Sequence, residues 1–302
     1  MADAVILTCH GTIADLSDLE AFLRNVRRGR PAPPELVEEV RRRYELIGPS
    51  PLLETSCAQA AALEARLGVP CRAAGRLWGP YPSEILGELA AAGATRVLSL
   101  PLAPQSVHVY HAAVEEAAKA LAPLSIVRSP PWGDEPALID AFVETIDAAL
   151  ATAPDVGANQ APVVLTAHSL PIRAIQAGDP YEAQFRGMAA LVAERLAPRG
   201  HRVLVAFQSR GATGDEWLGP DFGDTLRELA SQGFGAAVVA PIGFCAEHVE
   251  TLYDLDIEGA AAAKGAGIGR FLRARTVGTR PRFIDALEAV AKRALAAAAP
   301  AK

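Results

Sequence analysis

The chain has 302 residues, of which 50% are hydrophobic and only 6% aromatic, and its formal net charge is −6. This length allows one large or two medium domains with buried cores. The mildly acidic composition argues against a nucleic-acid partner. The N-terminus lacks the charged and apolar regions of a signal peptide, and no apolar run is long enough to span a membrane. We therefore expect a cytoplasmic protein without an integral membrane span.

The four cysteines, Cys9, Cys57, Cys71 and Cys245, lie far apart in the chain. None belongs to a CxxC pair, so their spacing argues against a zinc site, an iron–sulfur cluster and a disulfide framework. Cys9 and Cys245 lie at the ends of expected strands and could lie near a site. A role as small buried hydrophobic residues is the simpler interpretation.

Short, continuously apolar runs alternate with amphipathic segments along the chain. Runs of the first kind are typical of strands that are covered on both faces. We expect strands at 4–8, 96–102, 124–127, 163–167, 203–207 and 236–242. We expect helices at 19–28, 34–47, 59–67, 82–92, 111–121, 135–151, 181–196, 222–231 and 282–298. This alternation predicts an α/β fold with parallel sheets flanked by helices.

Two short patterns recur in the same order in each half of the chain. The run VILTCH at 5–10 resembles VVLTAH at 163–168, and the pattern P-x6-H-V occurs at both 101–109 and 241–249. Short apolar matches also arise by chance, but two matches in the same order indicate two similar α/β units.

If the two units face each other, His10 and Tyr110 of the first stand opposite His168 and Glu250 of the second. A cleft between two such units is the default place for a ligand. His168 follows a buried strand, where an imidazole can bind a metal or accept a proton. A lone histidine is more often structural, but a histidine and a carboxylate together form a weak, labile metal site, which suits a metal that is passed on.

The stretch 241–258 carries Glu247, Glu250, Asp254 and Glu258 at spacings of three, four and four residues. On an α-helix, these spacings put all four carboxylates on one side. Like charges stacked in this way cost free energy unless a cation neutralises them. A solvated face is the ordinary explanation of such a pattern. This one begins where a buried strand ends, which favours ligand binding.

Two other segments have polar or aromatic side chains that suit a planar anionic ligand. The segment 207–221 follows a strand and carries Trp217, and its glycines match no phosphate-loop pattern. A flat aromatic ligand would suit the indole, and a buried loop tryptophan is the alternative. The basic runs at 23–30 and 41–43 either form solvated helix faces or bind ligand carboxylates through planar guanidinium groups.

Five stretches together resemble the ferrochelatases, which insert Fe2+ into a porphyrin. They follow the family's order, cover nearly the whole chain and read LRNVRRGRPAPPELVEEVRRRYELIGPSPL, TAHSLP with GDPYEAQ, FQSR with WLGP, PIGFCAEHVETLYDLDIE and RPRFIDAL. The resemblance implies two similar Rossmann-like domains with the porphyrin in a cleft between them. We expect the first at 1–110 and the second at 111–302, with the C-terminal helix able to pack back on the first.

The family's metal-site histidine and glutamate fall on His168 and Glu250 by position. Asp254 and Glu258 match acids proposed to relay metal inward. In the branch that uses coproporphyrin III, the residues that contact the macrocycle and its propionates match positions in the first half. Together with Trp217, the implied porphyrin-binding residues are His10, Arg27, Arg43, Tyr44, Ser50 and Tyr110.

Two positions depart from the family pattern. His10, in TCHGTI, stands where this branch usually has a tyrosine that can ligate iron, so it would either replace that ligand or only pack there. Glu247-His248 stands where the family usually has Asp-His. The first departure bears on the choice of porphyrin and leaves the reaction itself unchanged.

The resemblance implies a haem-biosynthetic lyase with Fe2+ as substrate and haem as product. Coproporphyrin III is favoured, protoporphyrin IX is the other porphyrin, and no iron–sulfur cluster is expected. We expect a monomer. In the implied reaction a distorted porphyrin loses its pyrrole protons, with His168 and Glu250 sharing proton and metal binding in either order. The alternatives are a chelatase for another metal or tetrapyrrole and a non-catalytic haem or porphyrin carrier.

Overall fold

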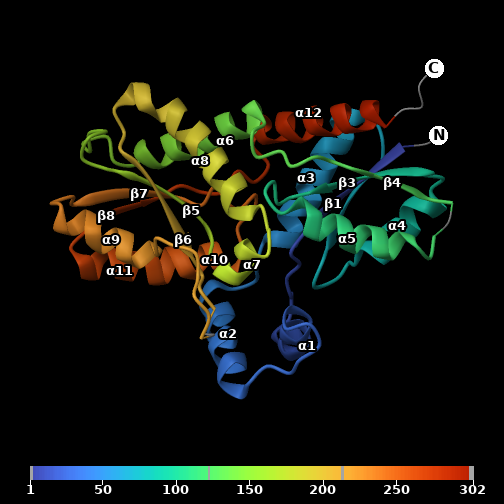
Figure 1. Ribbon diagram of the computed structural model, residues 1–302, viewed down its shortest axis with the longest axis horizontal. Coiled ribbons are helices and arrows are strands. Elements are labelled where there is room, and N and C mark those ends of the chain that lie inside the picture. Colours follow the sequence, from blue (N-terminus) through green and yellow to red (C-terminus); the bar gives the residue numbers. More distant parts are fainter. Residues whose placement is uncertain (1–2, 122, 212–213, 299–302) are drawn as a thin grey trace. The chain divides into compact units, whose positions relative to one another are not determined.

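The computed structural model describes residues 3–121, 123–211 and 214–298, which divide into two compact units (Figure 1). The first contains the described residues up to Trp132 and those from Gly278 onward, and the second runs from Gly133 to Val277. The first unit thus extends past Tyr110, where the sequence analysis had ended it. The reason is that β4 (Ser125–Arg128) pairs with β3 (Arg96–Pro101) in the first sheet.

The first unit contains a parallel four-stranded sheet in the order β2-β1-β3-β4. Its two remaining strands are β1 (Asp3–Cys9) and β2 (Cys71–Gly75). Buried apolar side chains hold α4 and α5 on one face, and α3 and α12 cover the other face (Figure 1). The helices of this unit are α1 (Leu19–Val26), α2 (Pro34–Ile47), α3 (Leu52–Leu67), α4 (Pro82–Ala91), α5 (Val107–Ala118) and α12 (Pro281–Ala297).

The second unit contains a parallel sheet in the order β6-β5-β7-β8. Its strands are β5 (Val163–His168), β6 (Val203–Gln208), β7 (Ala236–Ala240) and β8 (Arg270–Arg273). One face packs against α6 and α8, and the other against α9 and α11 (Figure 1). The helices of this unit are α6 (Pro136–Leu150), α7 (Ile172–Gln176), α8 (Tyr181–Leu196), α9 (Phe222–Ser231), α10 (Val249–Leu252) and α11 (Ala260–Ala266).

The two sheets have the same topology, because in each the first strand lies between the second and the third. The likeness extends to the loops. A Gly-Pro pair follows both β2 and β6, and the carbonyl groups of Pro80 and Pro220 accept hydrogen bonds from Gly75 and Phe207, each at 2.8 Å. The predicted α/β fold with two similar units is therefore confirmed. None of the described helices combines the length and apolar character needed to cross a bilayer.

The acidic stretch forms two helical segments of different geometry instead of one α-helix. After α10, residues Asp254–Gly259 form a π-helix, in which the N–H of Glu258 donates to the carbonyl of Tyr253 at 3.0 Å. Gly259 packs so closely on α9 that a Cβ there would lie 2.8 Å from the ring of Phe222. Asp254, the first residue of the π-helix, is nearly buried, and π-helical turns are frequent at functional sites.

Candidate functional site

His168 is the last residue of β5, and its main chain is held on both sides. The hydroxyl of Tyr181 donates to its carbonyl at 2.8 Å, and the next residue, Ser169, donates its N–H to the carbonyl of Gln208 at 2.7 Å. The imidazole is about one-third exposed. His168 therefore lies at the carboxyl edge of the sheet, where parallel α/β sheets bind ligands.

Glu250 lies in α10, which follows β7, the other neighbour of β5. The turn after β7 passes very close to β5, because the N–H of Gly243 donates to the carbonyl of Thr166 at 3.0 Å. A Cβ at Gly243 would lie 2.5 Å from that of Ala167, so this approach requires glycine. At the end of β6, the side-chain amide of Gln208 donates to the carbonyl of Glu250 at 2.6 Å.

These contacts place two imidazoles beside one carboxylate. Oε2 of Glu250 lies 3.6 Å from Nδ1 of His168 and 3.5 Å from Nε2 of His248. Both distances allow an ion pair when the imidazole is protonated. Nδ1 of His168 is buried and makes no hydrogen bond within the described part of the chain. The arrangement can exchange protons and offers nitrogen and oxygen atoms to a metal ion.

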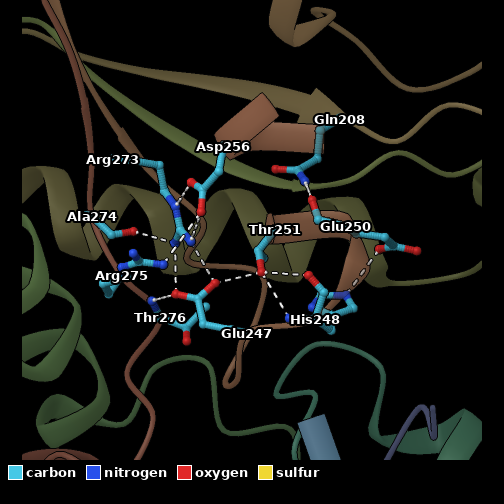
Figure 2. A network of polar contacts seen from close by, with 10 residues as sticks. All are labelled: Gln208, Glu247, His248, Glu250, Thr251, Asp256, Arg273, Ala274, Arg275 and Thr276. Atoms are coloured by element: carbon cyan, nitrogen blue, oxygen red, sulfur yellow. Dashed lines mark hydrogen bonds and ion pairs between the residues drawn. The ribbon is translucent and has the colours of Figure 1, made fainter. Parts of the chain in front are cut away.

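Glu247 does not belong to this group, contrary to the ridge of four acids expected on one helix. Its carboxylate accepts hydrogen bonds from Arg273 at 2.9 and 2.7 Å and from the N–H of Thr276 at 2.9 Å (Figure 2). Burial alone would raise the pKa of Glu247, but the hydrogen bonds and charge of Arg273 outweigh burial and hold that pKa below its ordinary value. Glu247 therefore forms a structural ion pair with Arg273.

Asp254 and Glu258 continue the acidic segment from Glu250 along the π-helix. The side chain of Asp254 is nearly buried and accepts a hydrogen bond from the hydroxyl of Ser209. Glu258 is exposed, whereas the carboxylate of Glu250 is 29% exposed. Ser209 has a φ of 60°, a left-handed conformation that is uncommon for serine and often marks functional sites. Of the three acids, Asp254 is thus nearly buried, Glu250 is partly exposed and Glu258 is exposed.

Within residues 3–121, 123–211 and 214–298, no three His, Cys, Asp or Glu side chains form a ready-made set of metal ligands. Cys9 and Cys245 are buried, and burial raises the pKa of each thiol. Neither cysteine is a thiolate at neutral pH, so the structure agrees with their interpretation as small buried hydrophobic residues. A metal ion at His168 and Glu250 would keep most of its coordination positions for other ligands.

In the first unit, His10 follows β1 as His168 ends β5. Its ring lies 6.4 Å from that of Phe22, centroid to centroid. Tyr44 of α2 is nearly buried, and its hydroxyl lies 3.2 Å from that of Thr12. Tyr110 of α5 lies under the guanidinium group of Arg76, 5.5 Å from the ring centroid.

The remaining porphyrin-binding candidates of the first unit lie on α2 and in two loops. Arg43 of α2 forms an ion pair with Glu39. Arg27, just after α1, donates from Nε to the carbonyl of Pro31 at 3.0 Å. Ser50 is half-buried, and its hydroxyl makes no hydrogen bond among the described residues. Arg27 and Arg43 are both partly exposed, so a ligand carboxylate can reach them.

Trp217, the one candidate in the second unit with a ring that could stack on a porphyrin, lies in a paired loop. Its neighbours Glu216 and Leu218 hydrogen-bond to Ile172 and Leu170 across a short antiparallel contact. The indole is half-buried and covers Gly211, where a Cβ would lie 2.7 Å from the ring. Its Nε1 makes no hydrogen bond within the described residues.

Similarity to known proteins identifies the family. The ferrochelatase family model matches residues 2–295. A ferrochelatase of Thermus thermophilus is 36% identical and aligns with 94% of this chain and 96% of its own length. The chain belongs to the ferrochelatase family. It is therefore an enzyme, a lyase that inserts Fe2+ into a porphyrin for haem biosynthesis, and both the expected family and the expected reaction are confirmed.

Further ferrochelatase relatives and solved chelatases are similar over nearly the whole chain. The coproporphyrin III ferrochelatase of Bacillus subtilis is 34% identical and aligns with 95% of this chain and 96% of its own length. The solved structure of SirB from Bacillus subtilis with Fe3+ has a TM-score of 0.62 at 17% identity, covering 97% of this chain and 96% of SirB. The second likeness concerns the fold alone.

Several residues at this site were missed by the sequence analysis. Gln208, Thr251 and Asp256 lie in stretches that resemble the family, but neither they nor Arg273 were named there as site residues, although all four help to anchor the acidic segment. Arg273 ends β8, a strand that the sequence analysis did not expect. Arg273 is one of three arginines in RFLRAR at 270–275, and nothing in this run distinguishes it from the other two.

Proposed function

We propose that His168 and Glu250 carry out the metal insertion of this ferrochelatase. The observation that carries the proposal is the 3.6 Å approach of Nδ1 of His168 to Oε2 of Glu250 at the ends of parallel strands. Insertion of Fe2+ releases both pyrrole protons of the porphyrin, so the reaction needs proton acceptors close to the metal. An imidazole and a carboxylate that lie side by side can accept these protons.

Asp254 and Glu258 are proposed to bring Fe2+ toward this pair or to carry protons away from it. Their support is their place on the segment that continues from Glu250, where Asp254 is nearly buried and Glu258 is exposed. Carboxylates bind Fe2+ weakly enough to release it again.

For the porphyrin, we propose coproporphyrin III, with protoporphyrin IX as the alternative. Several relatives of 33–37% identity are named coproporphyrin III ferrochelatase, including that of Frankia alni. Coproporphyrin III carries four propionates, and the partly exposed Arg27 and Arg43 are suited to binding them. His10, Tyr44, Ser50, Tyr110 and Trp217 are proposed as further contacts of the macrocycle. We place the enzyme in the cytoplasm and propose that it holds no iron–sulfur cluster.

The test is an anaerobic absorbance assay of the purified protein with Fe2+, in which coproporphyrin III and protoporphyrin IX are supplied in parallel. We expect loss of the free-base spectrum at a higher kcat/KM with coproporphyrin III. A preference for protoporphyrin IX would overturn the substrate proposal alone. Binding of both porphyrins without insertion would indicate a carrier and overturn the roles of His168 and Glu250. Insertion of Co2+ in preference to Fe2+ in a competition assay would contradict iron as the natural metal.

A further inference from the structure

Arg273 holds two carboxylates at the end of β8. Its side chain is 7% exposed and lies between Glu247 and Asp256 (Figure 2). The guanidinium group donates two hydrogen bonds to Glu247, two to Asp256, at 2.6 and 3.1 Å, and one to the carbonyl of Ala274 at 2.9 Å. All five of its N–H groups are therefore used. Because these groups lie in one plane, they fix both carboxylates relative to the strand.

The carboxylate of Glu247, fixed by Arg273, in turn binds Thr251. The hydroxyl of Thr251 is fully buried and donates to Oε2 of Glu247 at 2.6 Å. The hydroxyl oxygen of Thr251 in turn accepts a hydrogen bond from the main-chain N–H of His248 at 3.0 Å (Figure 2). A continuous series of hydrogen bonds thus joins β8 to the residue that precedes α10.

The segment held in this way is the first turn of a longer helical run. α10 comprises Val249–Leu252 and continues through Tyr253 into the π-helix at Asp254–Gly259. Because the ends of helices fray, the place of this first turn depends on its anchors. These are Thr251 at the main-chain N–H of His248 and Gln208 at the carbonyl of Glu250. In a reaction that depends on orientation, a displacement of about 1 Å can cost about a hundredfold in rate.

We infer that Thr251 and Arg273 are positioning residues, which act through Glu247 to hold the carboxylate of Glu250 and the ring of His248 toward His168. Neither residue needs to touch the porphyrin or the metal. The inference rests on the proposed function, because it matters for catalysis only if His168 and Glu250 carry out the insertion. The buried hydrogen bonds of Arg273, Glu247 and Thr251 would then affect the rate of metal insertion as well as the stability of the fold.

The experiment compares Thr251→Val with Thr251→Ser in the full-length enzyme. Valine keeps the size of threonine but removes the hydroxyl, whereas serine keeps the hydroxyl. For Thr251→Val, we expect kcat for metal insertion to fall about tenfold or more, with the porphyrin dissociation constant unchanged within about twofold. Thr251→Ser should recover most of kcat. A purely structural role would lower the folded fraction without separating kcat from porphyrin binding in this way.

Thr145→Val is the matched control. Thr145 is also buried in the second unit, and its hydroxyl donates to the carbonyl of Phe142 at 2.7 Å within α6. Its loss should leave kcat unchanged. A Thr251→Val enzyme with the kcat of the wild type would overturn the inference. If Thr251→Val does not fold, Glu247→Gln interrupts the same series from the other side, and a wild-type kcat there would overturn it equally.

A crystal structure of Thr251→Val provides a measurement that does not depend on turnover. We expect the distance from Nδ1 of His168 to Oε2 of Glu250 to increase by about 1 Å or more. If the wild-type protein inserts no metal, the proposed function fails and this distance alone decides the positioning role. An unchanged distance would overturn the inference even if the wild type is active.

Discussion

At the carboxyl end of β1, the first unit has His10 near Phe22, and Tyr110 lies beneath a guanidinium group. At the same end of β5, the second unit has His168 facing Glu250. The strand order is the same in both units, so the difference arises from the segments and side chains that follow the strands. One scaffold thus has a histidine near an aromatic ring in one copy and a histidine beside a carboxylate in the other. Function follows the residues placed on a fold, and the fold alone does not determine it.

The largest expected effect comes from replacing each of the two equivalent histidines, His168 and His10, with alanine. His168→Ala should lower kcat for Fe2+ insertion by about 10²–10⁴-fold, because the group that we propose to transfer protons is lost. His10→Ala should reduce kcat far less and should mainly raise the porphyrin KM. Steady-state kinetics of both variants, with porphyrin binding followed by fluorescence quenching, would provide these numbers. Equal losses of kcat would contradict the division of roles between the units.

A smaller effect is expected from the close approach of the turn after β7 to β5 in the second unit. Gly243→Ala places a methyl group against Ala167, so we expect the free energy of unfolding to fall by about 1–3 kcal/mol. Because the displaced turn leads into α10, kcat should fall as well. The control in the first unit is Gly87→Ala in α4, where a Cβ meets nothing within 4 Å. This substitution should stabilise the protein by about 0.5–1 kcal/mol.

Urea denaturation followed by circular dichroism would measure both glycine variants. A Gly243→Ala protein as stable and as active as the wild type would show that the turn after β7 can shift without moving Glu250.

The smallest expected effect is on the pH dependence of the free energy of unfolding, to which the two units contribute in different pH ranges. In the first unit, His111 is buried, with Nε2 donating to the carbonyl of Ser129 at 2.9 Å and Nδ1 2.8 Å from the hydroxyl of Ser99. Burial lowers the pKa of His111 below its ordinary value of 6.5. The unfolded chain therefore binds a proton that the folded chain excludes. The free energy of unfolding should fall as the pH drops below 6.5, by at most about 1.4 kcal/mol per pH unit.

His111→Gln should remove this part of the pH dependence, because glutamine does not titrate. In the second unit, the pKa of Glu247 is also lowered, but from 4.5, so its contribution is present above pH 4.5 and is lost only at more acidic pH. Denaturation curves of the wild type and His111→Gln at several pH values would test this. Identical slopes between about pH 7 and about pH 5 would exclude His111 as the source.

The sequence predicted the strands that are apolar throughout, such as β1, β5 and β7, because buried parallel strands have that composition. It missed β2 (Cys71–Gly75) and β8 (Arg270–Arg273). Alanine and glycine in CRAAG have low strand propensity, and RFLR is a short edge strand with arginine at both ends. These segments adopt strand conformation because they pair with β1 and β7, and that pairing is not visible in the local sequence.

The site shows the same limit. His168 and Glu250 were predicted as a pair, and the structure brings them together. The separation of Glu247 from the other acids was not predictable, because helical spacing assumes that all four acids lie on one regular helix. Here Glu247 precedes α10, and its carboxylate binds Arg273 of β8. After α10, the chain also changes to a π-helix. Both features depend on tertiary contacts, which a local pattern does not contain.

The return of α12 to the first unit sets an order for folding during synthesis. Phe283, Leu287 and Val290 of this helix are buried in that unit, where the ring of Phe283 lies 6.1 Å from that of Trp132. The unit that leaves the ribosome first therefore cannot bury its whole core until the last residues have been made, whereas residues 133–277 are continuous in the chain. Chains released early would expose the face of the first sheet that α12 covers. Such exposed apolar surface is what chaperones bind and what drives aggregation.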